Sequence, residues 1–80
     1  MKIDEAFQMM VDNRQLWGRP LSWRGSGLGV YLVGGVRPVI VPNPRGSYGP
    51  GFIPVYKDVI DEWEVIDPDI ILNEALPSNW

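Results

Sequence analysis

The chain has 80 residues and contains neither cysteine nor histidine. Without cysteine, neither a disulfide nor a zinc site of the cysteine type can support the fold. Without histidine, it lacks the commonest general base and the commonest metal-binding side chain. The Ser-His-Asp and Cys-His arrangements of nucleophilic catalysis are therefore excluded. These absences favour a binding protein over an enzyme, with no catalytic residues, cofactor or metal.

Long apolar runs are also missing. The longest, residues 27–36, is interrupted by glycine and is about half of the roughly 20 residues that cross a bilayer. Lys2 is followed by Asp4 and Glu5, unlike the start of a signal peptide. We therefore expect a cytoplasmic protein that does not bind membranes. A domain this small buries only about 60% of its unfolded surface, so we expect homo-oligomerisation to supplement its core.

Acidic residues are absent from the middle of the chain. Residues 13–57 carry six cationic side chains and no acid, whereas residues 58–80 carry seven acids and no base. All nine glycines lie in the acid-free segment, together with Trp17, Trp23 and Tyr31. Arginine forks, aromatic faces and glycine-exposed backbone are typical of a site for a phosphorylated base. The alternative is that the arginines only pair with the acidic C-terminal segment.

The net charge of −3 and the acidic C-terminal segment disfavour duplex nucleic acid as a partner. A small ligand can reach a local basic pocket that a long polyanion cannot. We therefore expect a small phosphorylated nucleotide.

The hydrophobic pattern predicts an α+β domain: an N-terminal helix packed on a small antiparallel β-sheet, with a short C-terminal helix. Ile3, Ala6, Phe7 and Met10 recur on one helical face, which predicts a helix over residues 3–13. An extended segment is expected over 16–23, with Pro20 indicating a sheet edge or a bend, followed by a hairpin with strands at 29–33 and 36–41 around Gly34-Gly35. A helical turn is expected at 56–60 and a strand at 62–66 with Trp63 in the core. Asp67 as N-cap and Pro68 at the first helical position predict a final helix through Glu74.

Two motifs invite a chemical interpretation. Gly25-Ser26-Gly27-Leu28-Gly29 has the spacing G-x-G-x-G, which is not the dinucleotide-binding fingerprint. We interpret it as a flexible loop leading into the hairpin; the alternative is that its N–H groups face an anion. A cluster of carboxylates in the C-terminal part could hold Mg²⁺ or act in hydrolysis, but is interpreted as the solvated face of a strand. It consists of Asp58, Asp61, Glu62 and Glu64.

The order of these elements resembles a known phage family. The features that carry the resemblance are the helix with Glu5-Ala6-Phe7, Arg19 followed by Trp23 and a glycine loop, Val30-Tyr31-Leu32, and Gly51-Phe52-Ile53-Pro54 leading to Asp58…Trp63. Over residues 4–66 the chain is similar to the second type of phage Thoeris anti-defence protein. It differs in having Asn13-Arg14 where the family has Gly-Lys, and Glu62 where the family has Asp. We expect an anti-defence-like domain over 1–66 and a C-terminal extension over 67–80.

The resemblance implies a homotetrameric sponge in the cytoplasm of the infected bacterial host. Such a protein binds cyclic nucleotide-type immune signals, glycocyclic ADP-ribose or cyclic oligonucleotides, and sequesters them without cleavage. Trp23, at a matched motif position, would stack on a base. Residue type and location add Arg24, Tyr31, Arg37, Asn43, Arg45 and Tyr48 as ligand-binding candidates. The alternatives are a small virion structural or assembly protein, and a protein-directed inhibitor of a host factor whose acidic half mimics nucleic acid.

Overall fold

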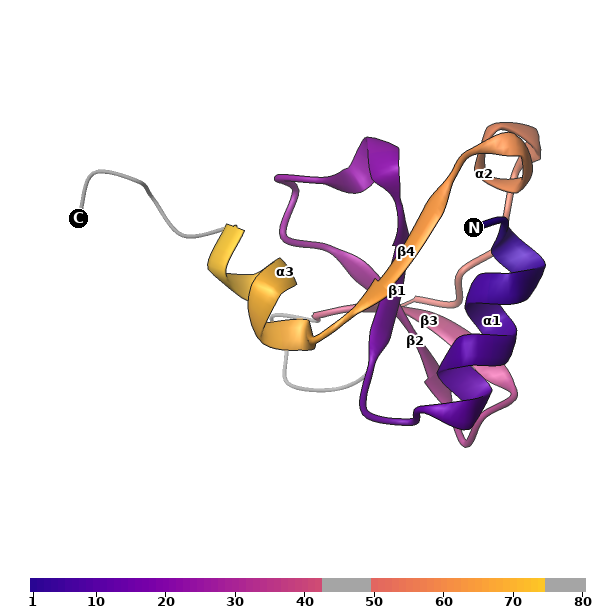
Figure 1. Cartoon of the computed structure of the whole chain (residues 1–80), viewed down its shortest axis with the longest axis horizontal. Helices are drawn as coiled ribbons and strands as arrows, with labels where there is room; N and C mark the ends of the chain where they lie inside the picture. Colours follow the sequence, from indigo (N-terminus) through magenta and orange to yellow (C-terminus); the bar gives the residue numbers. More distant parts are fainter. Residues whose placement is uncertain (43–49, 75–80) are drawn as a thin grey trace.

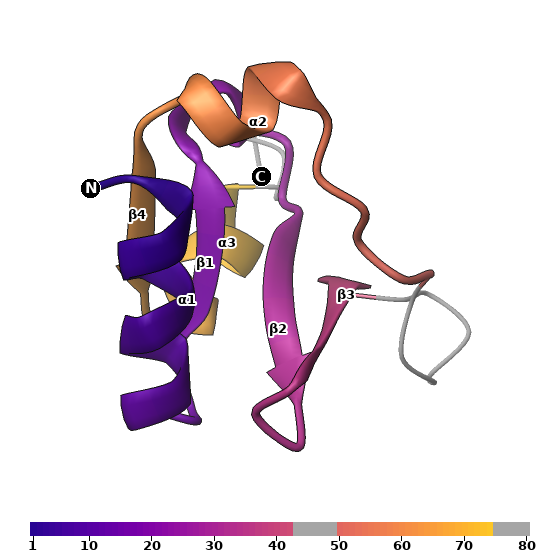
Figure 2. The same ribbon diagram turned by 90° about the vertical axis from the view of Figure 1, so that its right-hand side faces the viewer.

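The structure is a computed structural model that describes residues 1–42 and 50–74. Within these residues a four-stranded antiparallel sheet has the strand order β3-β2-β1-β4, and helices α1 and α3 lie on its opposite faces (Figures 1 and 2). This confirms the predicted α+β class. The elements are α1 (Ile3–Asp12), β1 (Trp17–Pro20), the 3-10 helix η1 (Leu21–Trp23), β2 (Gly29–Val33), β3 (Arg37–Val41), α2 (Tyr56–Ile60), β4 (Trp63–Ile66) and α3 (Pro68–Glu74).

The main core lies between α1 and the sheet. Ala6 and Met10, on the predicted apolar face of α1, are buried against it. The helix approaches β1 so closely that a Cβ on Gly18 would lie 2.9 Å from Cε of Met10. The indole N–H of Trp63 donates to the carbonyl of Asp58 at 2.8 Å, so this buried ring is satisfied. The buried members of this core are Ala6, Met10, Val30, Leu32, Phe52, Trp63 and Val65.

Side chains of the sheet alternate between the two helix layers. Gly18 faces α1, so its neighbours Trp17 and Arg19 point to the opposite side. Arg19 is opposite Glu64 in the register, which places Glu64 on the same side. We call this side the α3 face. By alternation and register it comprises Trp17, Arg19, Gly29, Tyr31, Val33, Arg37, Val39, Val41, Glu64 and Ile66.

Helix α3 covers part of the α3 face. It begins as predicted, because Oδ1 of Asp67 accepts the backbone N–H of Asp69 at 2.8 Å. Ile71 is fully buried: a Cβ on Gly29 would lie 3.1 Å from its Cδ1 and 3.4 Å from Cε3 of Trp17. The described part of the expected C-terminal extension therefore packs on the sheet.

The extended segment predicted over 16–23 is wrong beyond Pro20, because Leu21–Trp23 form a 3-10 helix. Pro20 has no N–H to donate, so the strand cannot continue its ladder toward β2. Pairing between β1 and β2 is limited to Gly18 opposite Val30. The predicted hairpin is confirmed, with positive φ at both Gly34 and Gly35 between its strands. The predicted helix over 3–13 and strand over 62–66 are each one residue shorter than expected.

Candidate functional site

A buried arginine stands at the centre of the α3 face. Arg19 is 1% exposed and contacts two carboxylates from different elements. Its Nε lies 2.7 Å from Oε2 of Glu64 on β4. Its Nη1 and Nη2 lie 2.6 Å and 3.1 Å from the two carboxylate oxygens of Glu74 at the end of α3. Both Nη groups therefore bind one anion in the bidentate geometry that suits carboxylates and phosphates.

A β-turn supplies further donors to the same carboxylates. The N–H of Ser26 donates to the carbonyl of Trp23 at 3.0 Å, and Gly25, with φ of +83°, has the conformation of the third residue of a type II turn. The Gly25 N–H donates to Oε2 of Glu74 at 3.1 Å. Arg24 donates from Nε and Nη2 to Glu64, at 3.2 Å and 3.0 Å. We call Arg19, Arg24, Gly25, Glu64 and Glu74 the Arg19 cluster.

The cluster is electrically balanced, with two guanidinium groups and two carboxylates. Hydrogen bonds from Arg19 first, and then from the Gly25 N–H, lower the pKa of Glu74 to about 2. The pKa of Glu64 is lowered, chiefly by its hydrogen bond from Arg24. The pKa of Arg19 is raised, above all by Glu74. All four side chains are therefore charged at neutral pH, and the pairing of arginines with the acidic segment is confirmed for Arg19 and Arg24.

The residues predicted to bind ligand occupy different places. Arg24 belongs to the Arg19 cluster, while Tyr31 and Arg37 lie on the α3 face, the former half-buried and the latter exposed. Trp23 instead packs against the α1-side core, with its ring edge-on to Phe52 at 5.7 Å. Asn43, Arg45 and Tyr48 lie outside the described residues.

Sequence reasoning missed the residues that anchor the cluster. Trp17 and Arg19 are two positions apart in a strand and therefore share a face, and this signal was available. Glu64 lies between the core residues Trp63 and Val65, which places it on the opposite face by the same rule. Glu74 pairs with a residue 55 positions away, and no local pattern indicates that contact.

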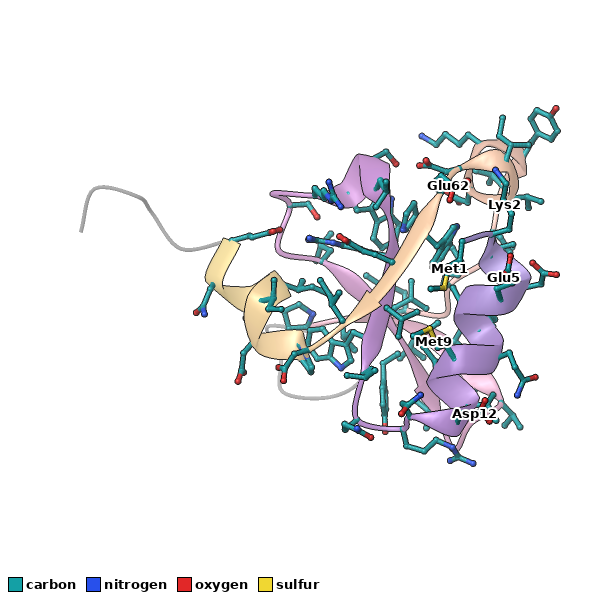
Figure 3. All side chains as sticks on the ribbon, viewed as in Figure 1. Met1, Lys2, Glu5, Met9, Asp12 and Glu62 are labelled. Atoms are coloured by element: carbon teal, nitrogen blue, oxygen red, sulfur yellow. The ribbon has the colours of Figure 1, made fainter. Side chains whose placement is uncertain are left out.

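The acidic cluster expected to be a solvated strand face has mostly structural contacts. Asp58 is buried and accepts the backbone N–H of Val55 at 3.1 Å, at the start of α2. Asp61 accepts the Ser22 N–H at 3.4 Å, and its pKa is lowered first by a hydrogen bond from the Ser22 side chain and further by this backbone N–H. Glu62 lies beside Lys2, 3.1 Å from its Nζ (Figure 3). Across residues 1–42 and 50–74, no group of three or more carboxylates is placed to hold a metal ion.

Comparison of the chain with models of protein families, with curated proteins and with solved structures found no match. The likeness to the Thoeris anti-defence family therefore rests on the sequence motifs quoted above. Within the described part of the chain, no helix has the length and apolar character needed to cross a membrane.

Proposed function

We propose that this protein binds a small phosphorylated nucleotide signal and withholds it without cleaving it. One observation carries the proposal: Arg19 directs two guanidinium N–H groups, and Gly25 a backbone N–H, at a single anionic group. In this conformation that group is the carboxylate of Glu74. Phosphate oxygens accept the same bidentate hydrogen bonds from arginine, and they also accept bonds from glycine N–H groups.

The α3 face also offers groups that suit the rest of a nucleotide. Trp17 and Tyr31 supply partly buried aromatic rings on this face, and base–aromatic stacking contributes about 1–3 kcal/mol per base. Arg37, exposed at the start of β3, provides a cation for a second phosphate. Trp17 takes over here the stacking role first given to Trp23, whose ring packs against Phe52.

The resemblance supplies the finer assignment. The ligand is a cyclic ADP-ribose-type or cyclic oligonucleotide immune signal, the assembly is a homotetramer, and the setting is the cytoplasm of an infected bacterium. A sponge must hold its ligand tightly, and nanomolar affinity corresponds to about −12 kcal/mol. Several charge-assisted contacts and a stacked base together are of that order.

Sequestration rather than hydrolysis is supported by the acids themselves. Among the described residues, four carboxylates have a pKa that departs from the usual value, and in each it is lowered: Asp61, Glu62, Glu64 and Glu74. A general acid at neutral pH needs the opposite shift. The chain also lacks histidine and cysteine, the usual base and a usual nucleophile.

Titration calorimetry against cyclic ADP-ribose isomers and cyclic di- and trinucleotides tests the proposal. At least one should bind with submicromolar affinity and be recovered unchanged by chromatography. Arg37→Gln should weaken binding about tenfold, the effect of losing one charge-assisted contact. The matched control Lys57→Gln removes the same charge from exposed α2 and should change affinity less than twofold. Absence of heat with every ligand, in folded protein, would refute the proposal, and conversion of the ligand would indicate an enzyme.

A second candidate function, a structural or assembly protein, is favoured by an exposed apolar surface around α2. Ile53 and Tyr56 are 82% and 78% exposed, and Val55, Val59 and Ile60 are also exposed. Several large apolar side chains exposed on one segment of the chain are typical of protein interfaces. Sedimentation of the double variant Ile53→Ser, Tyr56→Ser distinguishes the two functions. Loss of assembly with ligand binding intact would assign this surface to protein contacts and the α3 face to the nucleotide.

A further inference from the structure

The orientation of Arg19 is fixed by groups other than Glu74. Its backbone belongs to β1, paired with β4, and its Nε is held by Glu64. Glu64 is in turn held by Arg24 through both carboxylate oxygens. With Nε occupied, the two Nη groups face α3 whichever anion lies there. The two Nη groups of Arg19 are therefore preorganised, and a ligand that binds them does not lose free energy in ordering the arginine side chain.

The second donor is equally preorganised. The hydroxyl of Ser26 donates to the Trp23 carbonyl at 2.6 Å and accepts the Leu28 N–H at 3.1 Å, so the turn is held by its own hydrogen bonds. The Gly25 N–H donates outside the turn, to Oε2 of Glu74. A Cβ placed on Gly25 would meet no atom within 4 Å, so the space beside this residue is open.

The present occupant, by contrast, sits on a lightly held element. Glu74 ends a helix of seven residues, and its side chain is 34% exposed. Within the described residues of α3, Ile71 is the one buried side chain, while Ile70 and Leu72 are exposed. Short helices with few buried contacts open at low free energy. Glu74 can therefore leave the site without unfolding of the sheet.

We propose that the Nη groups of Arg19 and the Gly25 N–H form a phosphate site, and that Glu74 occupies it as an internal competitor. A phosphate group of the ligand replaces the Glu74 carboxylate, and Arg24 supplies the second positive charge beside it. Assigning the phosphate to a nucleotide rests on the function proposed above, whereas the exchange at the site does not. Helix α3 thus sets the affinity of the site.

The competition has a measurable consequence. The apparent dissociation constant equals the intrinsic constant divided by the fraction of molecules whose site is free. If Glu74 occupies the site in about 90–99% of molecules, removing its charge should tighten phosphate binding about tenfold to a hundredfold. The variant Glu74→Gln makes this change with little change of size. Asp69→Asn is the matched control, because Asp69 is an exposed acid of the same helix that does not contact Arg19.

The probe is inorganic pyrophosphate at constant ionic strength, followed by calorimetry and by the amide resonance of Gly25 and the Nε resonance of Arg19. We expect both resonances to shift on titration, and Glu74→Gln to bind at least tenfold tighter than the wild type and Asp69→Asn. Equal affinity of all three proteins, or shifts confined to other residues, would overturn the proposal. Should Glu74→Gln not fold, the wild-type titration alone tests the proposal. The Gly25 and Arg19 resonances should shift at saturating pyrophosphate, and unchanged resonances would show that the site does not exist.

The nucleotide panel distinguishes failure of this inference from failure of the proposed function. Tight nucleotide binding that Glu74→Gln leaves unchanged would disprove competition by Glu74 and leave sequestration standing. Tighter pyrophosphate binding by Glu74→Gln, without binding of any nucleotide, would support the competition and disprove the nucleotide assignment.

Discussion

Substituting Ile71 by alanine should detach α3 while the rest of the protein stays folded. Ile71 is the fully buried side chain of α3, and its Cδ1 would lie 3.1 Å from a Cβ placed on Gly29. Its truncation removes roughly three carbon atoms at about 0.8 kcal/mol each, and the cavity left behind brings the cost to about 3 kcal/mol. Helix α3 buries little else within the described residues, so this cost is comparable with its whole docking free energy. The helix should open locally before the sheet unfolds.

Amide hydrogen exchange measures the two events separately. Opening that is easier by about 3 kcal/mol should speed exchange at Gly25, whose N–H bonds to Glu74, about a hundredfold. Exchange at Val30, in the centre of the sheet, should change much less. Ile70→Ala is the control on the same helix, since Ile70 is half-exposed and its truncation should cost less than about 1 kcal/mol.

Two results would refute this reasoning. If Ile71→Ala accelerated exchange equally at Gly25 and at Val30, α3 would be part of the global folding unit rather than a separable element. If it left Gly25 exchange unchanged, the contact between Glu74 and the turn would not depend on docking of the helix. Either result would also weaken the case for exchange of Glu74 with a ligand.

Three further predictions concern the Arg19 cluster and the contact between α1 and the sheet. Arg19→Met removes the buried cation shared by Glu64 and Glu74 and should destabilise the protein by about 3 kcal/mol in urea denaturation. Arg24→Gln, at a side chain 58% exposed, should shift the midpoint little. The folded-state pKa of Glu74, about 2, lies below the usual value of a glutamate. The stabilising contribution of the Glu74 carboxylate is therefore complete above about pH 5 and is lost as the pH falls toward 2. Thermal midpoints measured across that range should fall less in Glu74→Gln than in the wild type. Gly18→Val should cost about 1–3 kcal/mol by calorimetry, because even a Cβ there meets Cε of Met10 at 2.9 Å; an unchanged midpoint would show that Met10 moves aside freely.

Local patterns predicted the elements whose causes are local. The helix followed from apolar residues at helical spacing, the hairpin from Gly34-Gly35, and the start of α3 from Asp67-Pro68. Pro20 indicated an edge or a bend, but the pattern did not show that β1 ends there. The strand stops because Pro20 has no N–H to donate to β2, and the position of β2 beside it is a tertiary contact.

The site was less predictable than the fold. Segregation of charge along the chain suggested that arginines and carboxylates meet, but not which pairs would form. Arg19 and Glu74 come together only because α3 packs on the side of the sheet to which the Arg19 side chain points. Trp23 was assigned to the ligand because it lies among arginines and glycines. That sequence context is the same whether the ring faces a ligand or packs against Phe52, as it does here.

The outer edge of β3 restricts how copies of this protein can associate. Its backbone is already engaged, since Ile40 donates to the Pro50 carbonyl at 2.9 Å and the Pro38 carbonyl accepts the Phe52 N–H at the same distance. These backbone groups are therefore not available to a strand from another molecule, and covering an edge in this way prevents edge-to-edge association of sheets. Continuous sheet formation between copies is thus blocked at the outer edge of β3, and any association of copies would have to use side-chain surfaces or the outer edge of β4.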